Sequence, residues 1–211
     1  YGCVNAMRPM EEPTIERTEN RVKIAVVDSG LQLSNQIRPY LCRNGHYSLV
    51  DASPLTDESP FKHGTNVAGL IAQNLNPHRE CLLIIKMIHP YLSQSEWDIY
   101  TSKAINYAMR QKVQFINLSF GGGGASIQEF QTIQAAIKQG MNFAVSSGNN
   151  SKNLDTKCDF FPACYVEKLD SKKFHVVGSS TGTYGNVGKV VAYMEDGTNK
   201  GGPSPLSGTS Q

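Results

Sequence analysis

The feature that most constrains the fold is the alternation of short apolar runs with longer amphipathic segments along the chain. Six runs have the length and residue types of strands, at 22–27, 81–88, 113–118, 142–146, 174–178 and 189–194. Segments with a helical period of apolar residues lie between several of them. Strands that alternate with helices pair in parallel and carry helices on both faces of the sheet. The sequence therefore predicts a three-layer α/β/α fold with a mostly parallel sheet.

Three helices are expected between these strands, the first over residues 63–75. Ser95 followed by Asp98 is a capping pattern for the second helix, and Ser126 followed by Glu129 is one for the third. The third helix has an apolar stripe made of Ile127, Phe130, Ile133 and Ile137. A stripe of this kind is expected to pack on the sheet.

Residues 1–21 are expected to form an arm, and residues 22–211 a single domain. The arm has two prolines and no helical period. Hydrophobic residues make up 39% of the chain and charged residues 18%, which excludes an extended disordered protein. A net charge of only +2 gives no strong basic footprint for nucleic acid. No apolar run approaches the roughly 18 residues that cross a bilayer, so neither nucleic acid nor a membrane is an expected partner.

Polar residues follow three of the predicted strands at the point where each strand ends: Asp28, Ser119 and Asn149. In parallel sheets these ends meet at one edge, where ligands bind. His63 begins the first helix and Ser210 lies in a late loop. An Asp, a His and a Ser from separate segments can serve as orienting group, base and nucleophile. Each residue alone also has a plain structural interpretation, as a cap, a helix-start residue or a loop hydroxyl.

The order of the short motifs is more specific than any single residue. Five of them follow one another: residues 28–30 (DSG), 63–69 (HGTNVAG), 119–122 (SFGG), 147–149 (SGN) and 208–210 (GTS). This set resembles the subtilisin-like serine proteases, in which the triad occurs in the order Asp, His, Ser. The resemblance runs from about residue 22 to residue 210. It implies that Ser210 is the nucleophile, His63 the general base, Asp28 its orienting carboxylate and Asn149 the oxyanion donor.

The resemblance also implies where a polypeptide substrate binds. The strand end formed by Ser119, Phe120 and Gly121 would pair with the substrate backbone. The first substrate pocket would be lined by this strand end and by Ser146, Ser147 and Gly148, with Asp159 and Phe160 at its base. A Phe160 ring in the pocket would admit only small side chains, whereas an Asp159 carboxylate there would favour Lys or Arg. In a third alternative both residues face solvent or pack under a loop.

Two departures from the family pattern carry further expectations. The short connection after the first helix leaves little room for the family's usual calcium loop, so no cofactor is expected. The chain ends at Gln211, one residue past the predicted nucleophile, where the family continues with a long helix. We therefore expect a truncated or processed form, partnered by a propeptide or by a separate C-terminal chain. A catalytically inactive relative that acts as a binding or regulatory scaffold is the alternative function.

The remaining motifs bear on competing functions and on the compartment. Glycines 121–124 lack the Lys-Ser/Thr of a phosphate-binding loop, and no Gly-x-Ser-x-Gly elbow of an esterase is present. Five cysteines leave an odd one over. Cys158 and Cys164 either close a small disulfide or are buried thiols. A secreted or periplasmic location is favoured over a cytoplasmic one.

Overall fold

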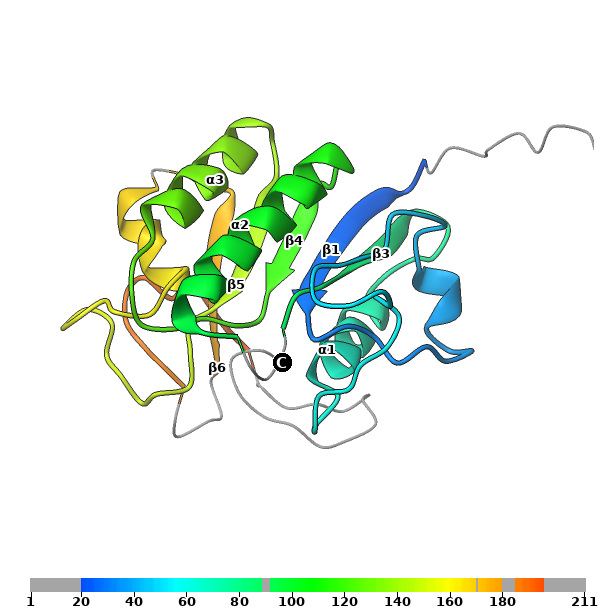
Figure 1. The fold of residues 1–211 in the computed structure, drawn as a ribbon. Helices are drawn as coiled ribbons and strands as arrows, with labels where there is room; N and C mark the ends of the chain where they lie inside the picture. Colours follow the sequence, from blue (N-terminus) through cyan, green and yellow to red (C-terminus); the bar gives the residue numbers. More distant parts are fainter. Residues whose placement is uncertain (1–19, 89–91, 170, 180–184, 196–211) are drawn as a thin grey trace, which may run out of the picture.

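The computed structural model describes residues 20–88, 92–169, 171–179 and 185–195, and these form an α/β domain around one sheet (Figure 1). The strands of this sheet are β1 (Val22–Asp28), β2 (Tyr47–Ser48), β3 (Glu80–Lys86), β4 (Phe115–Leu118), β5 (Asn142–Ser146), β6 (Phe174–Ser179) and β7 (Tyr193–Glu195). Their order is β2-β3-β1-β4-β5-β6-β7, and every neighbouring pair is parallel. The predicted parallel sheet is confirmed.

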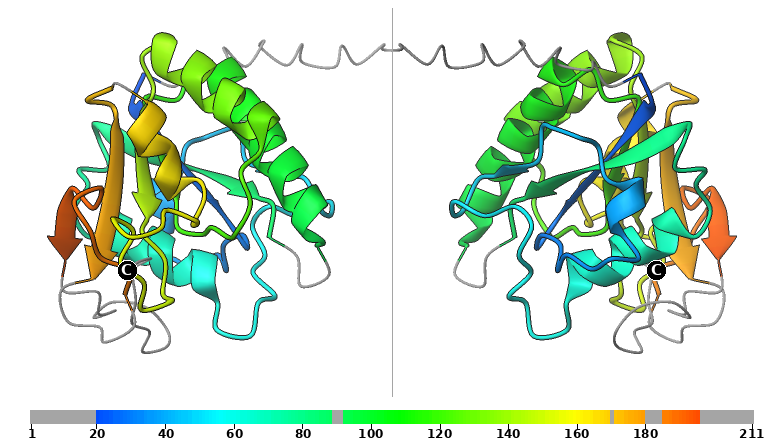
Figure 2. Two further views of the ribbon diagram at one scale, coloured as in Figure 1. Left: turned by 90° about the vertical axis from the view of Figure 1, so that its left-hand side faces the viewer. Right: turned by 90° about the vertical axis from the view of Figure 1, so that its right-hand side faces the viewer.

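Helices cover both faces of the sheet, as the sequence predicts. They are α1 (His63–Ala72), α2 (Gln94–Arg110) and α3 (Ile127–Lys138), with short 3-10 turns η1 (Arg38–Tyr40) and η2 (Ala163–Lys168). Successive residues of β1 point to opposite faces: Ala25 and Val27 join the core under α2 and α3, whereas Val26 joins the core under α1. Figures 1 and 2 show α2 and α3 side by side across one face of the sheet. The result is the three-layer arrangement.

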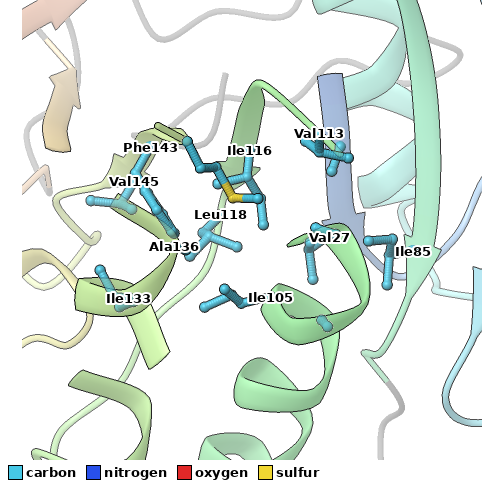
Figure 3. Packing of buried hydrophobic residues seen from close by; sticks show 14 of the residues in the cluster. Val27, Ile85, Ile105, Val113, Ile116, Leu118, Ile133, Ala136, Phe143 and Val145 are labelled. Atoms are coloured by element: carbon cyan, nitrogen blue, oxygen red, sulfur yellow. The ribbon is translucent and has the colours of Figure 1, made fainter. Parts of the chain in front are cut away.

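The larger core lies between the sheet and the pair α2 and α3 (Figure 3). Ile105 from α2 and Ile133 from α3 meet strand residues that include Leu118 and Phe143, and all four are fully buried. Burying a side chain of this size stabilises the fold by about 1.5–3 kcal/mol. This core therefore contributes much of the free energy that holds α2 and α3 on the sheet.

The helix starts agree with the sequence prediction in one case and differ in the other. Ser126 caps α3, where its hydroxyl accepts the N–H of Glu129. The cap of α2 is Ser93 in a capping box with Glu96, so the expected start at Ser95 is wrong by two residues. Ile127 is 78% exposed and does not join the apolar stripe of α3. It is the first helical residue, placed before the helix face meets the sheet.

Two disulfides lie within the described residues. Cys158 pairs with Cys164, so the disulfide is the correct one of the two alternatives for these cysteines. Cys42 pairs with Cys81, the second residue of β3. The second pairing was not predicted, because a separation of 39 residues carries no signal in the sequence. Cys3 lies outside the described residues.

The register of the sheet sets the place of the functional segments. Val27 of β1 is level with Leu118 of β4, and Leu118 is level with Val145 of β5. All three strands run in the same direction, so the residues that follow them emerge at the same edge of the sheet. The segments carrying Asp28, Ser119 and Asn149 therefore start side by side, as predicted.

Candidate active site

His63 and Asp28 are in direct contact at this edge. The ring Nδ1 of His63 lies 2.9 Å from Asp28 Oδ1 and 3.0 Å from Oδ2. An ionised carboxylate only accepts hydrogen bonds, so Nδ1 carries a proton and, in the neutral ring, Nε2 is the acceptor. Asp28 is buried, while the His63 side chain is 31% exposed. The pair thus presents a basic nitrogen at the surface, supported by a carboxylate in the interior.

Glycines allow α1 to begin this close to β1. A Cβ on Gly64 would lie 2.3 Å from the carbonyl oxygen of Gly30 and 3.1 Å from Asp28 Oδ1. Gly30 has a φ of +107°, a conformation that residues with a Cβ rarely adopt. The two glycines therefore bring the first turn of the helix, and with it His63, against the end of the strand.

The electrostatic surroundings of His63 favour its protonated form. Burial alone would lower the pKa of the ring, but the hydrogen bond and charge of Asp28 outweigh it. The charge of Asp57 adds to the effect, and the pKa of His63 is raised above its usual value. An imidazolium is thus stabilised where a general base would form one.

Ser210, the predicted nucleophile, lies outside the described residues, as do Gly208 and Thr209. Asn149, the predicted oxyanion donor, is exposed at the loop after β5. The structure thus brings Asp28 and His63 into contact. Asn149 follows β5 at the same edge of the sheet, with β4 between β5 and β1.

A buried amide that sequence reasoning missed holds the loop of Asn149. Asn186 Nδ2 donates to the carbonyl oxygen of Ser147 at 2.8 Å, and its Oδ1 accepts the N–H groups of Asn150 and Lys152, each at 3.0 Å. Asn186 is fully buried. An asparagine in a Gly-rich stretch usually indicates a turn, so no local pattern connects it with a loop 36 residues earlier.

Phe160 lies between the two predicted walls of the first substrate pocket. A Cβ on Gly121 would meet its ring at 2.5 Å, and a Cβ on Gly148 would meet it at 2.8 Å. Phe161 pairs with Gly122 through two backbone hydrogen bonds of 2.9 and 2.7 Å. The ring is therefore held in the space between the segments that follow β4 and β5.

The carboxylate of Asp159 is paired with two lysines rather than with the segments that form the predicted pocket walls. Its carboxylate accepts hydrogen bonds from Lys152 Nζ at 2.8 and 3.0 Å, and Lys157 Nζ lies 3.5 Å away. These partners hold the pKa of Asp159 below its usual value. A carboxylate paired with two lysines has little charge left to attract a cationic substrate side chain.

Three of the predicted wall residues have their hydroxyls turned to the protein. Ser119 Oγ accepts from Asn117 Nδ2 at 2.9 Å, and Ser147 Oγ donates to the carbonyl oxygen of Asn186 at 2.9 Å. Ser146 Oγ lies 3.4 Å from the carbonyl oxygen of Phe120. All three serines are buried, and so is Phe120. The hydroxyls of these segments are thus engaged within the protein.

Among the described residues, no group of three His, Cys, Asp or Glu side chains is arranged to hold a metal ion. The turn between α1 and β3, where the calcium loop of the family would lie, covers residues 73–79. Within the same described part of the chain, none of the helices is long and apolar enough to span a membrane.

The sequence matches the profile of the Subtilase family over residues 19–211. It is 31% identical over 160 residues to "Subtilisin" of Bacillus pumilus, an alignment that covers 72% of this chain and 56% of that protein. It is 29% identical over 161 residues to the "Major intracellular serine protease" of Bacillus subtilis, covering 70% of this chain and 49% of that protein. The chain thus spans about half the length of these relatives.

Solved structures show the same fold. A "cold adapted subtilisin-like serine proteinase" superposes with a TM-score of 0.71 at 21% identity, over 96% of this chain and 75% of that one. "MycP1 with the N-terminal propeptide removed" superposes with a TM-score of 0.68 at 21% identity, over 90% of this chain and 73% of that one. At this identity the likeness shows the architecture alone.

Proposed function

The chain belongs to the subtilase family, and on this basis we propose that it is a serine endopeptidase that hydrolyses peptide bonds through an acyl-enzyme. The observation that carries the proposal is the contact of His63 Nδ1 with the buried carboxylate of Asp28. It is the base and orienting pair that this chemistry needs, in a family whose members use it. Ser210, from the motif Gly208-Thr209-Ser210, is the proposed nucleophile.

Each proposed role follows from ordinary acid–base chemistry. Ser210 attacks the carbonyl carbon of the scissile bond, and Nε2 of His63 takes the hydroxyl proton. The same nitrogen returns the proton to the leaving amine as the bond breaks. Asp28 stays ionised, keeps the proton of the neutral ring on Nδ1 and stabilises the imidazolium. Water then repeats the sequence on the acyl-enzyme and releases the acid product.

Asn149 is the proposed oxyanion donor. Its side-chain amide would donate to the oxygen that becomes negative as the tetrahedral intermediate forms. Removal of one such donor costs about 10²–10³ in turnover. The hydrogen bonds of Asn186 to the Asn149 loop support the role, because a donor of this kind must be held in place before the charge develops.

The proposed substrate preference is for a small side chain before the scissile bond. The Phe160 ring lies between Gly121 and Gly148 and occupies the space that a larger substrate side chain would need. The ion pairs of Asp159 with Lys152 and Lys157 argue against the alternative preference for Lys or Arg. Ser119, Phe120 and Gly121 are proposed to bind the substrate backbone.

Other proposals concern the setting of the enzyme. Two disulfides fit an oxidising compartment, so a secreted or periplasmic location is proposed, although one matched relative is named an intracellular protease. No cofactor is proposed for the reaction. A propeptide or a separate C-terminal chain is a proposed partner; one structural neighbour is described with its own propeptide removed.

Hydrolysis of an unstructured polypeptide by the purified chain tests the proposal. Cleavage should be lost in Ser210→Ala and in His63→Ala while the circular dichroism spectrum is unchanged. Folded protein that binds the polypeptide without cleaving it would instead favour the alternative, a catalytically inactive scaffold.

A further inference from the structure

A second buried carboxylate, Asp57, lies in the loop that precedes α1. It is 3% exposed, and no motif marks it in the sequence. Its Oδ1 accepts the hydroxyls of Ser59 at 2.7 Å and Ser29 at 3.0 Å. Its Oδ2 accepts the N–H of Thr65 at 2.9 Å and the hydroxyl of the same residue at 2.7 Å. Both oxygens are thus engaged by segments that flank the pair of His63 and Asp28.

These contacts replace a cap that α1 lacks. Its N-cap residue, Lys62, is left-handed and makes no side-chain capping bond. The N–H of His63 instead donates to Ser59 Oγ at 3.0 Å, and the N–H of Gly64 donates to Ser29 Oγ at 3.0 Å. Together with the direct bond from Thr65, three N–H groups of the first turn are satisfied by Asp57 or by a hydroxyl bonded to it. A helix start without partners for these groups would be destabilised.

The same network reaches the other member of the pair. Ser29 directly follows Asp28, and its N–H donates to Asp28 Oδ1 at 2.7 Å. Ser29 therefore holds Asp28 through its backbone and Asp57 through its side chain. The end of β1 and the start of α1 are tied to one carboxylate.

The hydrogen bonds of this network favour an ionised Asp57. Burial opposes ionisation, but the hydrogen bonds from Ser59, Thr65 and Ser29 outweigh it and lower the pKa of Asp57. Lys62 Nζ donates to the carbonyl oxygen of Asp57. Lys86, at the end of β3, donates to the neighbouring Thr56 at 3.1 Å and is ion-paired with Asp51. Asp28 and Asp57 are the two anions that act on His63.

We propose that Asp57 is a positioning residue for the candidate active site: through Ser29, Ser59 and Thr65 it fixes the first turn of α1 and, with it, the place of His63 beside Asp28. The charge of Asp57 also favours a proton on the His63 ring. The role of His63 as a general base rests on the proposed function. The effect of Asp57 on the position and protonation of His63 does not. Asp57 does not contact the ring and takes no proton from it. It acts through the backbone of the helix start and through its electrostatic field, which is favourable at the N-terminus of a helix.

The test is the titration of His63, followed by nitrogen NMR of the imidazole in the unmodified chain, in Asp57→Asn and in Glu58→Gln. Asparagine keeps the shape of the side chain and removes the charge. The pKa of His63 should fall in Asp57→Asn. Glu58→Gln removes an exposed charge one residue away and should leave the titration nearly unchanged. An equal pKa in folded Asp57→Asn and in the unmodified chain would overturn the proposal.

A second measurement needs no substitution and so decides the matter even where Asp57→Asn does not fold. The carboxyl carbon of Asp57, followed by NMR in the unmodified chain, should show an inflection at the pH at which His63 titrates. A flat response across that pH range would refute the coupling. Neither readout depends on catalysis, so a chain without peptidase activity would contradict the proposed function and leave this inference intact.

Discussion

Asn186 Nδ2 donates to the carbonyl oxygen of Ser147 at 2.8 Å and so joins the segment after β6 to the loop after β5. The Oδ1 atom of the same amide accepts two further N–H groups of that loop. One buried side chain thus bonds to three backbone groups of the loop that carries Asn149.

Asn186→Asp should destabilise this loop, because a carboxylate oxygen would face the carbonyl oxygen of Ser147 in place of a donor. An unpaired buried polar group costs about 1–3 kcal/mol. Urea unfolding should show a loss of that order, and the amides of Asn150 and Lys152 should exchange faster with solvent. Asn35→Asp, at an exposed site, is the control and should change neither. Unchanged exchange at Asn150 would contradict the role given to Asn186.

Phe160→Ala should widen the substrate preference. Removing the ring opens the space between Gly121 and Gly148, so kcat/KM should rise for peptides with a large apolar residue before the scissile bond. One extra methylene in a hydrophobic pocket is worth about 1–3 kcal/mol, or roughly 10–200-fold. A peptide library checks this, with Phe115→Ala at the amino end of β4 as control. A strong preference of the unmodified enzyme for aromatic residues would contradict the assignment of Phe160.

Glu129 should make the stability fall as the pH rises. Burial raises the pKa of this carboxyl to about 7, opposed by the hydrogen bond from Tyr165 and reinforced by the charge of Asp98. The folded chain therefore keeps a proton that the unfolded chain releases near its ordinary pKa of about 4.3. The stabilisation is complete below that value and is lost as the pH rises through about 7.

Glu129→Gln should remove this dependence, because the amide stays neutral. Urea unfolding at pH 5 and pH 8 should show a smaller difference in the variant than in the unmodified chain. At pH 8 the variant should be more stable by roughly 1–3 kcal/mol. The exposed Glu167→Gln serves as control. A variant as sensitive to pH as the unmodified chain would disprove the role of Glu129.

The long disulfide should matter more for stability than the short one. Cys42–Cys81 closes a separation of 39 residues, and Cys158–Cys164 closes one of 6. A cross-link removes more freedom from the unfolded chain when its loop is longer. Replacing Cys42 and Cys81 by alanine should cost about 2–4 kcal/mol, and replacing Cys158 and Cys164 should cost less. Thermal unfolding of the two double variants gives the comparison. A larger loss of stability on removing Cys158–Cys164 than on removing Cys42–Cys81 would contradict the prediction.

Much of the fold could be predicted because its signals are local. The apolar runs gave the strands, and the parallel arrangement followed from their alternation with helices. The start of α2 could not be fixed, because Ser93 with Glu96 and Ser95 with Asp98 are the same pattern in two registers. The choice between them depends on how the helix packs, which no local pattern records.

The residues of the candidate site also fall into two groups, those that a local motif identifies and those that it does not. His63 and Asp28 could be identified because each belongs to a short motif, and the structure brings them into contact. Asp57 and Asn186 could not, because each acts through bonds to segments distant along the chain. An aspartate in a polar loop and an asparagine beside a glycine look like ordinary turn residues.

The most direct test of the central claim is labelling with a fluorophosphonate probe, which reacts with an activated serine. Mass spectrometry of the labelled chain should find the adduct on Ser210, and His63→Ala should lose it because the base is gone. Glu58→Gln, next to the site but exposed, should label as the unmodified chain does. Absence of the adduct from Ser210 in folded protein, or equal labelling of His63→Ala, would contradict the assignment of a serine protease site built on His63 and Asp28.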